Sequence, residues 1–388
     1  MQESTENPTD FRRKPFAGTS CSTSFSFSPL IHINGAYAAK GREGNVFLII
    51  HKRVLRRIAA ITAVAAVLVA GFSWQYSRQT AAEAEPDEPD FIRWVDFQAS
   101  YEALEAALEL DIASQETDTP VSWIDLIALA AAKNGNNFSS FKRRELESYV
   151  QQLQEGKALE ELTEKLSYFP YYREAYGAAL GGLVGHFEIE VDDETAPGGK
   201  RFEPQYGLKA FLPIAKGYPY SDYDDFGVSR TYGFTRRHLG HDFMGATGTP
   251  IIAVEGGVVE ALGWNQYGGW RIGIRSLDGK RYYYYAHLRQ NFPFNKSLEE
   301  GSIVQPGDVI GYMGHTGYST TENVNNIEQP HLHFGMQLIF DESQKESDNE
   351  IWIDVYPIVR LLTRHRCSVV KDPETKEYSR VYAYREST

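Results

Sequence analysis

The stretch PIIAVEGGVVEALGWNQYGGWRIGIRSLDGKRYYYYAHL, residues 250–288, decides the fold class of the second half of the chain. Runs rich in Val, Ile and Tyr alternate there with Gly, Asn and Asp, which favour tight turns between strands. The same alternation continues through GDVIGYMG at 307–314 and PHLHFGMQLIF at 330–340. This pattern predicts a mainly antiparallel domain, resembling a β-sandwich or barrel, over residues 207–362.

A helical pattern precedes the β-rich region, over residues 95–184. Tyr101, Leu104 and Leu108 recur at helical spacing, and similar apolar stripes follow further along this segment. Such stripes more often form a core than a binding surface. The sequence therefore predicts an α+β chain of several units, in which a small helical domain of unassigned role comes before the β domain.

One candidate membrane segment lies near the N-terminus. IAAITAVAAVLVAGFSWQYS, residues 58–77, contains no charged residue. As a helix it would cover roughly 30 Å, the hydrocarbon thickness of a bilayer, and the four basic residues within 52–57 favour a cytoplasmic start. We expect a single-pass protein of a bacterial cell membrane, with everything after Arg78 outside the cytoplasm. A signal peptide cleaved near 82–84 is the alternative and would give a secreted protein.

The remaining segments are predicted to connect or extend these units. Residues 1–57 are rich in Ser, Gly and Pro and show no sustained period, which indicates a disordered cytoplasmic tail or an upstream start assigned in error. An acidic linker is expected at 78–94 and a second linker at 185–206. Residues 363–388 are expected to form a C-terminal tail.

Composition excludes several classes of protein. With 388 residues, of which 42% are hydrophobic, the chain is large enough to bury a full core and is not a disordered protein. Its formal charge of −13 argues against a long basic face for nucleic acid. The two cysteines, Cys21 and Cys367, lie on opposite sides of the predicted membrane segment, so we expect neither a disulfide framework nor a zinc thiolate site.

Three short histidine motifs lie in the β-rich half: HLGHD at 238–242, YYAHL at 284–288 and PHLHFG at 330–335. Together they offer what a catalytic zinc needs, namely three protein ligands, an open position for water and spare imidazoles for proton transfer. Alternate side chains of a strand share one face, so both histidines of the last motif would point into one groove. The motifs therefore indicate a metallohydrolase.

In these motifs and their order the chain resembles the lysostaphin-type, or LytM-like, zinc peptidases, which hydrolyse peptide bonds in bacterial cell walls. The resemblance covers about residues 207–358, and its motifs are His238-x-Gly-x-Asp242, GTPIIAVEGG at 248–257, Tyr285-x-His287-Leu288, PGDVIGYMGHTGYS at 306–319 and His331-x-His333. It implies one zinc ion per catalytic domain, bound by His238, Asp242 and His333. It also implies that His287 and His331 form the catalytic pair.

The function implied by this resemblance is a zinc endopeptidase that cleaves peptides of bacterial peptidoglycan with a zinc-activated water. Two neutral imidazoles and one carboxylate leave such a site with a net charge near +1, which lowers the pKa of bound water towards about 7. Residue type alone does not assign which imidazole takes the proton. The alternatives are a non-catalytic protein that uses the same groove to bind the wall or activate another hydrolase, and a zinc peptidase that acts on proteins.

Several further features carry weaker expectations. The insert TENVNNIEQ at 321–329 departs from the family pattern, and we expect a loop at the rim of the groove that affects substrate choice. Tyr283 and Tyr285 would share one strand face, which either lines the cleft or packs in the core. His241 is expected to lie beside the ligands without binding metal, and the acidic segment 221–230 is expected to form a turn rather than a calcium site.

Overall fold

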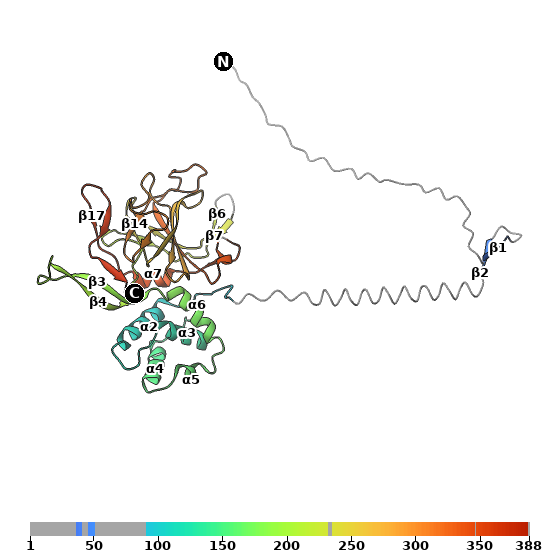
Figure 1. Cartoon of the computed structure of the whole chain (residues 1–388), viewed down its shortest axis with the longest axis horizontal. Coiled ribbons are helices and arrows are strands. Elements are labelled where there is room, and N and C mark those ends of the chain that lie inside the picture. The colour runs from blue at the N-terminus through green and yellow to red at the C-terminus, as the bar shows by residue number, and fades with distance from the viewer. Residues whose placement is uncertain (1–35, 41–45, 51–90, 232–234, 346, 387–388) are drawn as a thin grey trace, which may run out of the picture. The chain divides into compact units, whose positions relative to one another are not determined.

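A computed structural model provides the structure of the chain and describes residues 36–40, 46–50, 91–231, 235–345 and 347–386 (Figure 1). The chain forms two compact units, Met1–Pro89 and Asp90–Thr388. The predicted membrane segment at 58–77 lies outside the described residues. Within the described ranges, no helix combines the length and hydrophobicity that a membrane crossing requires.

The first unit is described only as a β-hairpin. Strand β1 (Ala36–Lys40) pairs antiparallel with β2 (Val46–Ile50), with Ala36 opposite Ile50. The sequence of β2, VFLII, is rich in the branched and aromatic residues that favour strands. The expected lack of secondary structure in residues 1–57 therefore does not hold for these two strands.

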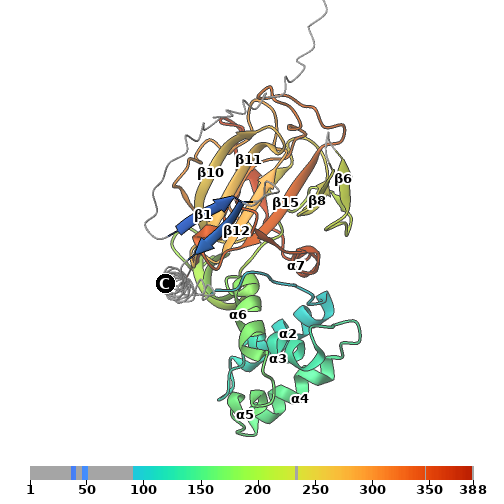
Figure 2. The ribbon, with the colours of Figure 1, turned by 90° about the vertical axis from the view of Figure 1, so that its right-hand side faces the viewer.

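The second unit begins with helices, which Figure 2 shows packed below the sheet. Ser100 and Ser122 cap the first two helices, because their side chains accept hydrogen bonds from the backbone N–H groups of Ala103 and Ile124. The helical region predicted from the apolar stripes is thus confirmed. Its helices are α2 (Tyr101–Ser114), α3 (Trp123–Asn134), α4 (Arg143–Gln154), α5 (Leu159–Thr163) and α6 (Phe169–Leu180).

The helices and the β region share one continuous hydrophobic core, which includes Leu104 and Leu129 of the helices and Tyr283 and Phe334 of the strands. Fully buried Arg281 of the sheet also donates a hydrogen bond to the backbone carbonyl of Ala178 in α6, at 2.6 Å. The helical region is therefore part of the same compact unit as the β region.

The main sheet contains the strand order β13-β10-β11-β12-β15-β8-β5, and β16 pairs with β15. All of these pairings are antiparallel, which agrees with the predicted sheet type. Figure 2 shows β10, β11, β12, β15 and β8 side by side in this order. The bounds are β5 (Ser221–Asp222), β8 (His241–Met244), β10 (Gly257–Asn265), β11 (Gly269–Ser276), β12 (Arg281–Ala286), β13 (Ile303–Val304), β15 (His331–Leu338) and β16 (Ile351–Trp352).

Smaller elements complete the β region. Strand β9 (Pro250–Ile252) pairs with β14 (Val309–Tyr312), and β6 (Ser229–Thr231) pairs with β7 (Thr235–Arg237); Figure 2 shows β6 next to β8. Helix α7 (Tyr356–Leu362) and the hairpin of β17 (Val369–Lys371) and β18 (Tyr378–Arg380) follow near the C-terminus. A short 3₁₀ helix, η1, spans Glu342–Gln344.

The segments predicted as a linker at 185–206 and a tail at 363–388 are structured. Strand β3 (Val184–Asp192) pairs along its whole length with β4 (Lys200–Leu208), and β19 (Tyr384–Glu386) adds a third strand on the other side of β3. The second partner of β3, strand β19, comes from the far end of the described chain. Local sequence patterns do not reveal such a pairing.

The predicted alternation along β12 and β15 is present, and it decides which tyrosines pack. Tyr283 and Tyr285 are fully buried, and Tyr283 stacks on Phe334 with a centroid separation of 6.1 Å. The hydroxyl of Tyr285 accepts a hydrogen bond from the backbone N–H of Val254 at 3.1 Å. The core interpretation is therefore the right one for this pair, and Tyr284, on the opposite face, lines the groove instead.

Candidate metal centre

Two neighbouring strands and one loop bring the predicted ligands together. In the β8–β15 ladder Asp242 lies directly opposite His333. His238 follows β7, and the loop is held in place because its backbone N–H donates to the carbonyl of Val228 at 2.9 Å. At Gly240 an added Cβ would lie 2.6 Å from Cε1 of His333, so only glycine lets the loop pass this close to the histidine ring.

The donor atoms of His238, Asp242 and His333 converge on one point. Nε2 of His238 lies 2.9 Å from Nδ1 of His333 and 3.1 Å from Oδ1 of Asp242, and the last two atoms are 3.0 Å apart. His238 and Asp242 are buried, and His333 is half-buried. Two imidazole nitrogens and one carboxylate oxygen at this spacing can hold a metal ion.

Electrostatics keep the carboxylate of this group ionised. Burial by itself would raise the pKa of Asp242. The close polar contacts with His238 and His333, and the positive charge that His333 and His331 carry when protonated, outweigh burial and hold the pKa of Asp242 well below its usual range. The carboxylate is therefore in the form that a metal ion requires.

A carboxylate and a guanidinium behind the ligands fix their orientation. The Nδ1–H of His238 donates to Oδ1 of Asp225 at 2.9 Å, which leaves Nε2 free of a proton and directed at the other donors. Arg230 pairs with Asp225 and also with Oδ2 of Asp242, the latter at 2.9 Å. Asp225 lies within the segment 221–230, which the sequence predicted only as a turn, and its supporting role was not foreseen.

His241 does not face the ligands. It precedes Asp242 in β8 and therefore points to the other side of the strand, where its Nε2 hydrogen bonds with Oδ2 of Asp222 at 3.0 Å. It is almost fully buried rather than solvated. The expectation that His241 is not a metal ligand agrees with this placement.

The two remaining predicted histidines lie beside the ligands, with ring centroids 4.7 Å apart. Each directs Nδ1 at a backbone carbonyl: His287 at that of Thr316 and His331 at that of Gln329, both at 2.9 Å. A neutral imidazole that donates at Nδ1 presents an unprotonated Nε2. Burial, followed by the charges of His331 and His333, places the pKa of His287 well below 6.5, so this ring is neutral at physiological pH.

The predicted residues line one pocket of about 170 Å³. The pocket contains residues that the sequence did not single out, above all two arginines, Arg230 and Arg236. Burial and the nearby charge of Arg230 lower the pKa of Arg236. The complete lining is Arg230, Arg236, His238, Asp242, Tyr267, Gly268, Tyr284, Ala286, His287, Tyr318, Ile327, His331 and His333.

The insert at 321–329 borders this pocket, as expected, and contributes Ile327 to its lining. Several hydrogen bonds hold the insert. Among them, the indole N–H of Trp270 donates to Oδ1 of Asn323 at 2.9 Å, and Nδ1 of His315 donates to the carbonyl of Ile327 at 2.7 Å. The loop therefore forms one wall of the pocket, and hydrogen bonds fix its position.

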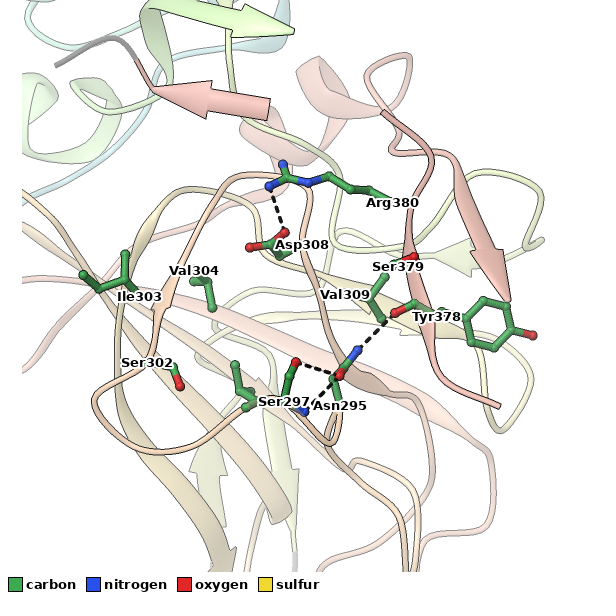
Figure 3. A pocket seen from close by; sticks show the side chains of 11 residues that line it. Asn295, Ser297, Ser302, Ile303, Val304, Asp308, Val309, Tyr378, Ser379 and Arg380 are labelled. Atoms are coloured by element: carbon green, nitrogen blue, oxygen red, sulfur yellow. Dashed lines mark hydrogen bonds and ion pairs between the residues drawn. The ribbon is translucent and has the colours of Figure 1, made fainter. Parts of the chain in front are cut away.

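A second cavity, of about 440 Å³, lies away from the metal centre (Figure 3). Its polar groups are paired with one another. Arg380 forms an ion pair with Asp308 at 3.0 Å, and the Asn295 side chain donates to the backbone carbonyl of Tyr378 at 3.1 Å.

Comparison with known proteins places these motifs in a family. The model of peptidase family M23 matches residues 236–347, which contain all five predicted site residues. The L-Ala–D-Glu endopeptidase of Bacillus subtilis (strain 168) is 39% identical over 161 residues, which are 41% of this chain and 45% of that protein. The peptidoglycan DD-endopeptidase ShyC of Vibrio cholerae is 30% identical over 153 residues, which are 38% of this chain and 31% of that protein.

Among solved structures, the catalytic domain of the antimicrobial peptidase lysostaphin from Staphylococcus simulans is 31% identical over 36% of this chain and 92% of that domain, with a TM-score of 0.29. The chain spans less than half the length of either curated relative. The matched residues carry the ligand group and both neighbouring histidines. The resemblance read from the motifs is thus confirmed: residues 236–347 of the chain match the model of peptidase family M23.

Proposed function

We propose that this chain is a zinc-dependent endopeptidase that hydrolyses peptide bonds in bacterial peptidoglycan. The observation that carries the proposal is the convergence of three metal donors, 2.9–3.1 Å apart, next to two histidines whose Nδ1 atoms each lie 2.9 Å from a backbone carbonyl oxygen. Ligand atoms of a tetrahedral zinc site lie about 3.3 Å apart, given bonds of about 2.0 Å, so the donor spacing fits this ion. The names of the two relatives, an L-Ala–D-Glu endopeptidase and a peptidoglycan DD-endopeptidase, support the substrate class.

Zinc, when bound, supplies acidification of a coordinated water and polarisation of the scissile carbonyl. The protein's own part is proton transfer and charge stabilisation. Nε2 of His287 or His331 accepts the proton that the attacking water releases as its oxygen bonds to the carbonyl carbon. The same proton passes to the leaving amine when the C–N bond breaks, and the second imidazole stabilises the negative charge on the former carbonyl oxygen.

The non-catalytic alternative is less well supported. A protein that only binds the wall needs neither a complete set of metal ligands nor two further histidines beside it. In this chain all five side chains line one pocket. The presence of all three metal ligands and both neighbouring histidines favours a catalytic function over binding alone.

Location is a separate proposal. The uncharged segment 58–77, preceded by basic residues, supports a single membrane-spanning anchor with the peptidase domain outside the cytoplasm. Cell fractionation together with N-terminal sequencing of the native protein tests it. A mature N-terminus after residue 84 would instead indicate a cleaved and secreted protein.

The enzymatic proposal is tested by incubating purified peptidoglycan with the zinc-loaded protein. Liquid chromatography with mass spectrometry should reveal new muropeptides with one additional free amino group, and His331→Ala should abolish them. Absence of new products from the zinc-loaded wild-type protein would contradict the proposal. Cleavage of unfolded protein in preference to wall fragments would point to the protein-directed peptidase instead.

A further inference from the structure

We infer that Arg236 forms an anion subsite of the pocket, and that it binds a free carboxylate on the peptide close to the bond that is cut. The inference rests on the proposed function, because it names a feature of the same substrate. It concerns a residue outside the metal and proton-transfer group. Arg236 lies in β7, two residues before His238.

The two arginines of the pocket differ in their partners. Arg230 pairs with Asp225 and with Asp242, so its charge is balanced from within the protein. For Arg236, the part of the chain that the structure describes supplies no ion pair, and its buried Nε has no hydrogen-bond partner. Arg236 lines the pocket, so a ligand that enters it can supply the acceptor that the described residues do not offer to this guanidinium.

The position of Arg236 limits where the acceptor lies on the substrate. The guanidinium carbon lies 5.0 Å from the centroid of the Tyr318 ring, and that ring lies 5.6 Å from the ring of His287. The guanidinium is therefore within about 11 Å of a histidine that we assign to proton transfer. An extended peptide covers about 3.3–3.6 Å per residue, so the bound group belongs to one of roughly three residues next to the scissile bond.

The charge of the pocket favours an anionic group. Among the lining residues are two guanidinium groups and one carboxylate, although the whole chain carries a formal charge of −13. A divalent metal ion adds to this local positive charge. A guanidinium whose face lies over an aromatic ring keeps its edge available, and that edge matches the two oxygens of a carboxylate. A peptide carboxylate is the anion that a wall peptide offers.

A purely structural role is the competing explanation. The contact between Arg236 and Tyr318 by itself could hold the β6–β7 hairpin against the pocket. That contact accounts for the placement of the guanidinium, but it leaves the charge without an ion-pair partner among the described residues. The two explanations differ in one respect: only a subsite makes binding depend on the charge of the peptide.

The test uses two peptides that contain an L-Ala–D-Glu bond and are identical except at the free carboxyl of the glutamyl residue. One peptide carries the carboxylate and the other the carboxamide. Calorimetric titration of the chelator-treated full-length protein gives the Kd of each, without turnover. The kcat/KM of each is then measured with the metal-loaded protein.

We expect the wild-type protein to bind the carboxylate peptide about 10- to 100-fold more tightly than the carboxamide, the range for hydrogen bonds to charged groups. Arg236→Gln should reduce this preference to less than about threefold. Arg236→Lys should retain part of the preference, because lysine keeps the positive charge but lacks the paired N–H donors of the guanidinium. Arg237→Gln, at the exposed neighbouring position of β7, is the matched control and should keep the full preference. Thermal unfolding of all three variants verifies that they fold.

The outcomes separate this inference from the proposed function. Equal binding of both peptides by the wild-type protein, or an equal loss in Arg236→Gln and Arg237→Gln, overturns the subsite. Equal kcat/KM for the two peptides would overturn it as well, while leaving the endopeptidase intact. If the carboxylate peptide binds more tightly through Arg236 but neither peptide is cut, the subsite stands and the proposed activity on this bond fails.

Discussion

His333 lies directly opposite Asp242 in the β8–β15 ladder, and its Nδ1 is 3.0 Å from Oδ1 of the carboxylate. Because adjacent strands carry both residues, the backbone hydrogen bonds of the sheet determine the distance between these two donors. His238, by contrast, comes from a loop and depends on its own hydrogen bonds for position. The sheet therefore preforms one side of the metal centre, and the loop completes it.

Ligands and proton-transfer residues should respond differently to substitution. We expect His238→Ala to weaken metal binding by more than the roughly 10–100-fold that follows the loss of an outer partner. His331→Ala should keep its metal and lower kcat by about 10²–10⁴-fold, as expected for a general acid–base residue. Metal content by mass spectrometry and turnover of wall fragments check this. Equal metal loss in both variants would refute the division of roles.

Asp225 should act on metal affinity through His238. Asp225→Asn replaces the charged acceptor of the Nδ1–H of His238 with a neutral amide, so the orientation of the imidazole ring is less firmly fixed. We expect the metal affinity to fall about 10–100-fold. Asp222→Asn is the matched control, because Asp222 bonds to His241, which faces away from the metal donors. Competition titration with a chelator measures both. An equal fall in the two variants would show a general effect on this segment rather than support of the ligand.

The lowered pKa of His287 predicts a pH dependence of stability. Between this lowered pKa and 6.5, the unfolded chain binds a proton at this residue and the folded chain does not. The free energy of unfolding should therefore rise with pH across that window and fall as the solution is acidified below 6.5. Chemical denaturation of the chelator-treated protein at several pH values, with His287→Gln as reference, measures it. The variant should show a flatter profile, and identical profiles would rule out the shift.

Arg281 should couple the helical and β regions in unfolding. Its guanidinium forms two hydrogen bonds with Glu255, at 2.8 and 3.0 Å, and a third with the carbonyl of Ala178 in α6. Arg281→Met leaves the buried Glu255 without its cation and should reduce the free energy of unfolding by about 3–5 kcal/mol. Arg201→Met, which breaks surface pairs with Glu203 and Asp193, should change it by less than about 1 kcal/mol. Similar shifts in the two melting curves would contradict this prediction.

Local sequence was sufficient for the elements that have a clear period. The alternation in β15 predicted that His331 and His333 share a face, and Leu332 between them is fully buried. Stripes at helical spacing predicted the helices before the sheet. Both results follow from backbone geometry, because the period of a strand or a helix determines which side chains lie on the same side.

Tertiary structure decided which face is used and which distant segments meet. Alternation could not show that Tyr284, rather than Tyr283 and Tyr285, borders the groove, since that depends on the layer that packs against the sheet. Nor could it reveal that Asp225 supports His238 or that Arg236 enters the pocket. These contacts join residues through loops and strand pairings that are long-range in the chain, and no local period records them.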